Sequence, residues 1–167
     1  MLKSIRLGAA GVAIAATLGM TSAAHAVTAQ ATATAEILEA LDVVAVSALD
    51  FGVIAANGAG TVAVATNSGV TCGANLICTG TAAAGQLTVD GSAGATVGIS
   101  LPNSTTTLAL VGNPGTTMSV TGLTLSTATL TLSGNPDAFT VGGTLAVAVG
   151  QAAGTYNGEY TVEVEYQ

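Results

Sequence analysis

The sequence predicts an all-β protein that folds as an antiparallel sandwich of two sheets, and three observations carry that prediction. Apolar and polar residues alternate with a period of two through much of the chain after residue 26, whereas the period of an amphipathic helix is nearly absent. Glycine, asparagine and proline separate the alternating runs, as turn residues do. About nine or ten such runs follow one another at roughly eight-to-twelve-residue spacing, the pattern typical of a β-sandwich.

The composition favours one ordered domain with an aliphatic core. Hydrophobic residues make up 50% of the 167 residues, but aromatic residues make up only 3%. Valine, leucine and isoleucine must therefore fill the core, with alanine and glycine around them. A chain of this length forms a single domain that buries roughly two thirds of its unfolded surface.

Residues 1–26 have the three parts of a secretory signal peptide. Lys3 and Arg6 are followed by an apolar run over residues 7–20 and by the small-residue triplet Ala24-His25-Ala26. The apolar run is shorter than the roughly twenty residues that a membrane-spanning helix needs. We therefore expect cleavage after Ala26 and export to the periplasm, the cell surface (as a fimbrium) or the extracellular medium, with no membrane span after cleavage.

Cleavage there would leave a chain without any basic side chain. Lys3, Arg6 and His25 are the only basic residues, and all three lie in the expected leader. The nine carboxylates all follow it: Glu36, Glu39, Asp42, Asp50, Asp90, Asp137, Glu159, Glu163 and Glu165. The exported chain would carry a net charge of about −9 at neutral pH. Nucleic-acid binding is excluded, because it depends on Lys and Arg contacts to phosphates.

The alternating runs divide the expected exported chain into an N-terminal segment, residues 27–40, and a sandwich domain, residues 41–167. The segment alternates polar residues with an apolar set, which is Ala29, Ala31, Ala33, Ala35 and Ile37. It is expected either to be an ordinary first strand or to extend away from the sandwich. A second strand region is expected from about Leu41 to Phe51.

The later runs each predict a strand with one inward-facing set of residues. These sets are Val62 and Val64; Leu87 and Val89; Val97, Ile99 and Leu101; Leu108 and Leu110; Met118 and Val120; Leu123 and Leu125; Leu130 and Leu132; Phe139 and Val141; and Leu145, Val147 and Val149. Asp90-Gly91 lies between two runs and predicts a hairpin turn. Asn113-Pro114-Gly115 and Gly134-Asn135-Pro136-Asp137 predict further turns.

The C-terminal segment predicts a turn followed by one regular strand. Tyr160, Val162, Val164 and Tyr166 alternate with polar residues, so they are expected to share one face of that strand. A strongly apolar last strand either pairs inside a sheet or offers its edge to a partner.

The two cysteines predict a structural disulfide and no metal site. Cys72 and Cys78 are close in sequence, and an exported chain folds in an oxidising compartment. A zinc site would need more Cys or His ligands than the chain has. Calcium prefers six to eight oxygens, usually from one loop, and Glu36, Glu39 and Asp42 do not form such a loop.

No pattern of residues predicts catalysis or a cofactor. Without His or Lys after the leader, only carboxylates, Tyr and Cys remain as candidate general bases. Asp50 precedes Phe51-Gly52 at a strand end, where its side chain is expected to cap a turn. Glu163 and Glu165 alternate with the apolar set of the last strand and are expected to face solvent. The protein is therefore not expected to be an enzyme.

Several motifs of the chain resemble a secreted bacterial family known as domain of unknown function 4402. They are the opening Ala-Thr-Ala-Thr-Ala-Glu-Ile-Leu-Glu-Ala-Leu, Leu49-Asp50-Phe51-Gly52, the cysteine pair, Val141-Gly142-Gly143-Thr144-Leu145, and the closing Ala-Gly-Thr-Tyr-x-Gly-x-Tyr-x-Val-x-Val-x-Tyr. Leu-Asp-Phe-Gly near the start and Gly-Thr-Tyr before a last strand ending in Tyr are also similar to spore coat protein U and to the pilins of the chaperone-usher pathway.

The pilin resemblance implies an immunoglobulin-like sandwich that lacks its last strand and assembles by strand addition. A periplasmic chaperone and then the N-terminal extension of the next subunit would fill the open groove, in the mode called β-augmentation. Here residues 27–37 would be the donor, and the strand ending at Tyr166 would border the groove. The donor offers mainly alanine, whereas deep pockets would require large apolar residues. The alternative is a complete monomeric sandwich, secreted or held at the surface, that binds a ligand or glycan.

Overall fold

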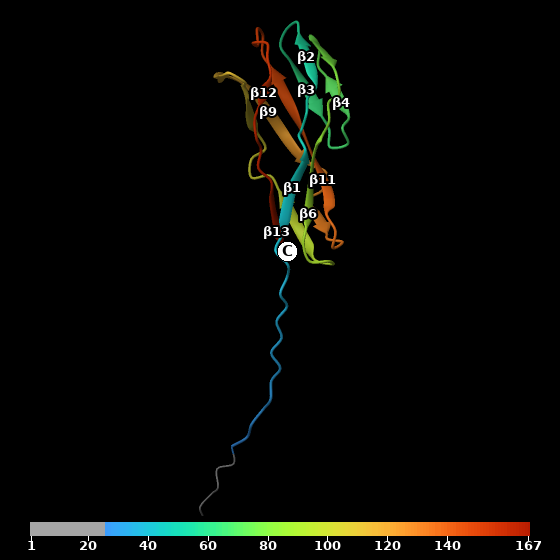
Figure 1. The fold of residues 1–167 in the computed structure, drawn as a ribbon, viewed down its shortest axis with the longest axis vertical. Coiled ribbons are helices and arrows are strands. Elements are labelled where there is room, and N and C mark those ends of the chain that lie inside the picture. The colour runs from blue at the N-terminus through green and yellow to red at the C-terminus, as the bar shows by residue number, and fades with distance from the viewer. Residues whose placement is uncertain (1–25) are drawn as a thin grey trace, which may run out of the picture. The chain divides into compact units, whose positions relative to one another are not determined.

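The computed structural model describes residues 26–167, and the expected leader lies outside the described residues except for Ala26. The chain divides into two units, Met1–Ala35 and Glu36–Gln167. Residues 26–35 contain no strand, and each of them is exposed. Residues 36–167 form the folded domain (Figure 1).

The described residues contain thirteen strands and no helix. The strands are β1 (Asp42–Ser47), β2 (Val53–Ala56), β3 (Gly60–Val64), β4 (Val70–Cys72), β5 (Leu76–Thr79), β6 (Gly85–Asp90), β7 (Thr96–Ser100), β8 (Thr106–Leu110), β9 (Asn113–Leu125), β10 (Thr129–Thr131), β11 (Asp137–Val147), β12 (Tyr156–Asn157) and β13 (Glu163–Tyr166). Every pairing between them is antiparallel. The predicted all-β class is confirmed.

The larger sheet has the order β1-β6-β11-β9-β8-β12, and β3 and β4 join it through β11. The long strand β11 makes this possible because two strands share one of its edges. Residues 137–141 pair with β6, and residues 143–147 pair with β3. The other edge of β11 pairs with β9, where Gly122 takes a φ of +60° beside a register shift. That shift is a β-bulge, which a residue with positive φ accommodates easily when it is glycine.

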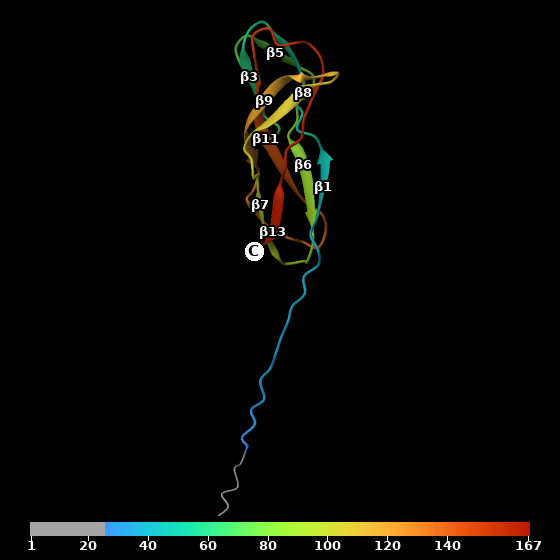
Figure 2. The ribbon, with the colours of Figure 1, turned by 90° about the vertical axis from the view of Figure 1, so that its left-hand side faces the viewer.

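The opposing layer is smaller. It consists of the three-stranded sheet β10-β7-β13, and a separate two-stranded ribbon pairs β2 with β5. Figure 2 shows β7 and β13 on one side of the domain and β6 and β1 on the other. The two layers enclose the core, so the predicted sandwich is confirmed.

The core is aliphatic, as the composition predicts. Its buried members are Phe51, Val62, Val64, Ala84, Leu87, Val89, Val97, Ile99, Met118, Val120, Leu123, Leu132, Phe139, Val141, Leu145 and Val147. No polar or charged side chain is buried among the described residues. Most of the predicted inward sets lie in this core. Val149 does not, because it follows the end of β11 and is 78% exposed.

Of the two alternatives for residues 27–37, the ordinary first strand is not formed, because their small side chains bury little apolar area to offset the entropy of ordering; the extension stays a prediction. Two predictions about local structure are wrong. Asp90-Gly91 does not close a hairpin, because β6 and β7 lie in different sheets and the turn connects the two layers. Asn113-Pro114-Gly115 belongs to β9, and the preceding turn is at Gly112, with a φ of +87°.

The motif Leu49-Asp50-Phe51-Gly52 forms the turn that the sequence predicts. The Gly52 amide donates a hydrogen bond of 2.8 Å to Asp50 Oδ1, and Gly52 has a φ of +74°. Asp50 also exchanges two backbone hydrogen bonds with Ala83, each 2.9 Å long. Phe51 enters the core as a result, and Leu49 packs against its edge.

Candidate functional site

An open groove lies between β1 and the segment that joins β12 to β13, and its cavity volume is about 400 Å³. One side consists of Ala45, Val46, Ser47, Ala48 and Leu49, and the other consists of Thr106, Gly158, Glu159 and Tyr160. The floor is apolar and is made by Phe51, Leu87, Leu108 and Val120. We call these residues the β1 groove.

Both sides of the β1 groove carry backbone that lacks a strand partner. β1 is the last strand of the larger sheet, so its outer edge has no ladder. Ala48 and Leu49, which continue from it, belong to no strand. On the other side, residues 158–162 interrupt the strand structure between β12 and β13. β13 is likewise the last strand of its sheet.

The inner face of β1 is also left uncovered. Val43 lies directly opposite Val89 in the β1–β6 ladder, so both side chains point to the same face of the sheet. Val89 is 0% exposed, but Val43 is 39% exposed. The small sheet ends at β13, and within residues 26–167 no strand beyond it covers β1. The sandwich is therefore open along this side.

The predicted C-terminal strand is only partly formed. Tyr160, Val162, Val164 and Tyr166 all pack against the core and are half-buried, as the alternation predicts. Only Glu163–Tyr166 forms a strand, paired with β7. Gly158 explains part of the interruption, because a Cβ there would lie 2.3 Å from the carbonyl oxygen of Thr107. The segment therefore approaches β8 closely without pairing regularly with it.

The outer two tyrosines of the C-terminal motif fasten loops to the domain. The Tyr156 hydroxyl donates to the Ala152 carbonyl at 2.8 Å and accepts from Gln151 Nε2 at 2.7 Å. The Tyr166 hydroxyl donates to the Glu39 carbonyl at 2.8 Å and accepts from the Ser92 amide at 2.9 Å. Tyr166 thus fixes the beginning of the folded domain.

Tyr160, the central tyrosine of the C-terminal motif, faces the β1 groove instead. Its hydroxyl lies over Gly85 of β6, where a Cβ would be 2.3 Å away from it. Unlike the other two, this hydroxyl makes no side-chain hydrogen bond within residues 26–167. Burial raises the pKa of the Tyr160 phenol above its ordinary value. The Tyr160 side chain therefore contributes an apolar wall to the groove, and its hydroxyl has no hydrogen-bond partner among residues 26–167.

The predicted assembly residues lie away from any strand. Ala29, Ala31, Ala33 and Ala35 are exposed members of the first unit, and Ile37 is exposed at the start of the second. No ladder uses their backbone groups. Their role as a donor strand stays a prediction.

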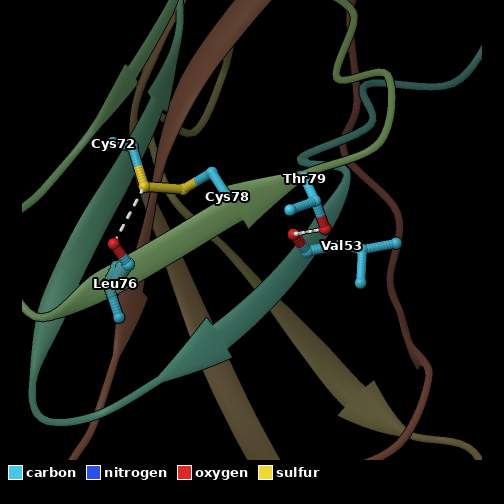
Figure 3. Close-up of a disulfide and its surroundings, with 5 residues drawn as sticks. All are labelled: Val53, Cys72, Leu76, Cys78 and Thr79. Atoms are coloured by element: carbon cyan, nitrogen blue, oxygen red, sulfur yellow. Dashed lines mark hydrogen bonds between the residues drawn. A yellow bond between two sulfur atoms is a disulfide. The ribbon is translucent and has the colours of Figure 1, made fainter.

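The predicted disulfide between Cys72 and Cys78 is present (Figure 3), with a Cα–Cα distance of 6.0 Å. Cys72 ends β4 of the larger sheet, and Cys78 lies in β5 of the two-stranded ribbon. The bond therefore holds the ribbon against the larger sheet. Thr79 Oγ1 adds a hydrogen bond of 3.4 Å to the Val53 carbonyl across the ribbon. None of these residues lines the β1 groove.

Charge is sparse at the groove. Glu159 is the only ionisable carboxylate among its lining residues, and residues 26–167 contain no Lys, Arg or His. Within this range no three Cys, Asp or Glu side chains are grouped so as to hold a metal ion. The described chain also contains no helix with the length and hydropathy to cross a membrane.

Sequence reasoning missed most of the groove. It identified Tyr160 on the apolar face of the last strand and Leu108 as an inward-facing residue, but it did not place Ser47, Ala48 or Thr106 beside them. The available signal was the run Ala45 to Leu49, which contains no charged residue and no Gly, Asn or Pro before Asp50. Only the sheet order shows that this run is an edge.

Comparison with known proteins gives one match. The model of the family described as domain of unknown function (DUF4402) matches residues 41–166. No curated protein and no solved structure matches the chain. The match covers most of the chain and nearly all of the folded domain, including the disulfide and the three C-terminal tyrosines. The chain therefore belongs to the DUF4402 family.

Proposed function

We propose that this protein is an exported, non-enzymatic subunit that assembles by β-strand addition, and that the β1 groove receives the added strand. One observation carries the proposal: an apolar floor is open between two edges whose backbone has no strand partner. An extended segment placed there would pair with the free edge of β1 and cover its inner face. On the other side, the Glu159 carbonyl already accepts a hydrogen bond from Thr106 Oγ1, so the added strand would use the neighbouring backbone groups.

The donor in this proposal is the segment over residues 27–37 of a second copy. It is exposed, it forms no strand of its own, and residues 27–35 carry no charged side chain. This uncharged part suits a groove whose only carboxylate is Glu159, because it brings no second carboxylate next to Glu159. The kinship to spore coat protein U and chaperone-usher pilins belongs to this proposal, as do a periplasmic chaperone, an usher and a location in a surface fibre.

Strand addition also explains why the exposed edges would be kept. Uncovered strand edges promote uncontrolled pairing between chains, and proteins usually block them with charge, proline or short strands. β1 has a register shift between Ala45 and Ser47, and β13 is short and carries Glu163 and Glu165, but Ser47, Ala48 and Leu49 carry neither charge nor proline. An edge that a specific partner strand occupies does not need them.

The test is a fusion that supplies the donor within one chain. Residues 27–40 are copied after Gln167 through a flexible Gly/Ser linker, and thermal unfolding and oligomeric state are compared with the unfused protein starting at Val27. We expect the fusion to raise the melting temperature and to be monomeric. The unfused protein should form oligomers or unfold at a lower temperature.

The matched control is the same fusion with Ala31 and Ala33 of the added copy changed to Asp. It preserves length and linker, but it would place carboxylates against the apolar floor, so the gain in melting temperature should vanish. An unchanged melting temperature with the native donor would contradict strand addition. It would favour a closed monomeric sandwich that binds a ligand or glycan, which a glycan array would then examine.

A further inference from the structure

The groove is shallow, because large side chains already occupy its floor. Phe51, Leu87 and Val120 are buried there, and Leu108 packs beside them. The open volume of about 400 Å³ is spread along the groove from Ala45 to Tyr160. A strand lying in it would find little depth under each inward-facing side chain.

The Tyr160 side chain further limits the depth of the β1 groove. Its backbone belongs to the segment on one side of the groove, but its hydroxyl lies over Gly85 of β6 on the other side. The backbone nitrogen of Leu49 is also close to this point, 3.1 Å from the position of a Cβ on Gly85. The ring therefore passes under the groove from one sheet to the other. Gly85 permits this crossing because any side chain there would meet the phenol.

The sequence of the donor matches a shallow groove. Its inward-facing set is alanine at four successive positions, Ala29, Ala31, Ala33 and Ala35, which lie between Val27 and Ile37. A donor for deep pockets would carry leucine, isoleucine or phenylalanine, and this mismatch weighed against strand addition when only the sequence was considered. Tyr160 accounts for a small side chain at the inward-facing position above its ring, and the buried floor residues Phe51, Leu87 and Val120 limit the depth beside it.

We propose that Tyr160 determines the specificity of the β1 groove by limiting its depth, so that the groove selects the segment Ala29–Ala35 of a second copy. This inference rests on the proposed function and adds a rule for the partner. The added strand must have small residues at alternate positions. Large aliphatic residues at those positions are rejected because the close-packed floor cannot move away from them.

A size-exchange experiment tests this rule with the fused protein. Ala31 or Ala33 of the added copy is changed to Leu, each in the native background and in the Tyr160→Ala background. We expect the native donor to raise the melting temperature of the native domain and the Leu donors to raise it much less. In Tyr160→Ala, at least one Leu donor should raise the melting temperature more than the native donor does.

Two controls separate size from other effects. Thr32→Leu in the added copy places the same side chain on the outward face of the strand, so it should not depend on Tyr160. Tyr160→Phe retains the ring and removes the hydroxyl, so it should preserve the preference for alanine. If Tyr160→Ala fails to fold, Tyr160→Leu shortens the side chain less and answers the same question.

The outcomes distinguish the two proposals. If the native donor does not stabilise the native domain, strand addition itself is wrong. If the native donor stabilises it and the Leu donors do so equally, or if no Leu donor gains from shortening Tyr160, strand addition stands and the depth rule is wrong. A preference lost in Tyr160→Phe would show that the hydroxyl, and not the size of the ring, selects the donor.

Discussion

The centre of the sandwich and its β1 edge are built from the same kinds of residues but differ in closure. At the centre, which we call the closed side, β11 lies between β9 and the pair β6 and β3, and Phe139 and Val141 are buried. At the β1 edge, which we call the open side, β1 and β13 each end a sheet, and every residue of β1 is exposed. Both sides contain runs of valine and alanine in alternation.

The difference shows that burial here depends on strand order and not on hydrophobicity. Val43 and Val89 are paired residues on one face, yet only Val89 has a layer above it. An aliphatic edge with no covering layer loses the stabilisation of about 25 cal/mol for each Å² of apolar surface that burial provides. That free energy is available to a partner strand instead.

Truncated side chains on the two sides should differ most in their cost to stability. Phe139→Ala on the closed side removes a side chain that is 2% exposed, so we expect a loss of about 3–5 kcal/mol in the free energy of unfolding. Val46→Ala on the open side removes a side chain that is 57% exposed, and we expect a change within about 0.5 kcal/mol. Urea unfolding of the unfused protein measures both. Equal losses would mean that the open side is covered in solution.

Methyl groups added on the two sides should also differ in their cost to stability. In Gly142→Ala, on the closed side, the new Cβ would lie 2.5 Å from the backbone oxygen of Val64, which has no room to move. We expect a loss of about 1–3 kcal/mol. In Gly85→Ala, on the open side, the nearest atom is the hydroxyl of Tyr160, whose side chain is able to rotate into the groove.

The loss for Gly85→Ala should therefore be smaller than for Gly142→Ala, although both glycines are buried. The displaced Tyr160 ring should also weaken the gain from the fused donor. Chemical unfolding with and without the fusion gives both quantities. A larger loss for Gly85→Ala would show that Tyr160 is held rigidly and that the open side is as closely packed as the closed one.

The disulfide lies outside both sides of the comparison. Replacing Cys72 and Cys78 together by Ser should lower the free energy of unfolding by about 2 kcal/mol, because the unfolded chain gains the freedom of the short loop. The gain in melting temperature from the fused donor should not change, since neither cysteine lines the β1 groove. A fusion that no longer stabilises the Ser variant would connect the ribbon to the groove.

The smallest expected effect is the dependence of stability on alkaline pH. Burial raises the pKa of Tyr160 in the folded state, so the unfolded chain loses its phenolic proton first as pH rises. Stability from this group is fully present below the unfolded pKa of about 10 and is lost as pH rises through the folded pKa. Tyr160→Phe should show a smaller decrease in unfolding midpoint over that range, measured by urea titration at neutral and alkaline pH. An identical decrease in both proteins would contradict the effect.

Much of the sandwich is predictable from local patterns. Alternation identified the inward residues of β3, β6, β7, β9 and β11, and the Asp50-Gly52 turn follows from an Asp side chain and a glycine with positive φ. The two cysteines are close enough in sequence for their pairing to be expected in an oxidising compartment. These features depend on neighbours in the chain.

The errors occur where a distant strand decides the outcome. Asp90-Gly91 has the composition of a hairpin turn, but the chain crosses to the other layer after it. There the Ser92 amide donates a hydrogen bond to the Tyr166 hydroxyl of β13. The alternation from Tyr160 to Tyr166 predicts one strand over that range, but residues 158–162 form no strand. At Gly158 the chain approaches β8 too closely for a regular ladder. Alternation gives the face of a residue and does not reveal whether a partner strand lies beside it.

The amino-acid sequence by itself determined that the chain is all-β, that its core is aliphatic, that its cysteines pair and that residues 26–167 carry no basic side chain. Each of these follows from residue type or from a period of two. The tertiary structure alone decided that β1 and β13 are edges, that a groove lies between β1 and residues 158–160, and that Tyr160 crosses beneath it. Edges and grooves are relations between strands distant in sequence, and the same alternating run is covered or uncovered according to which strand lies beside it.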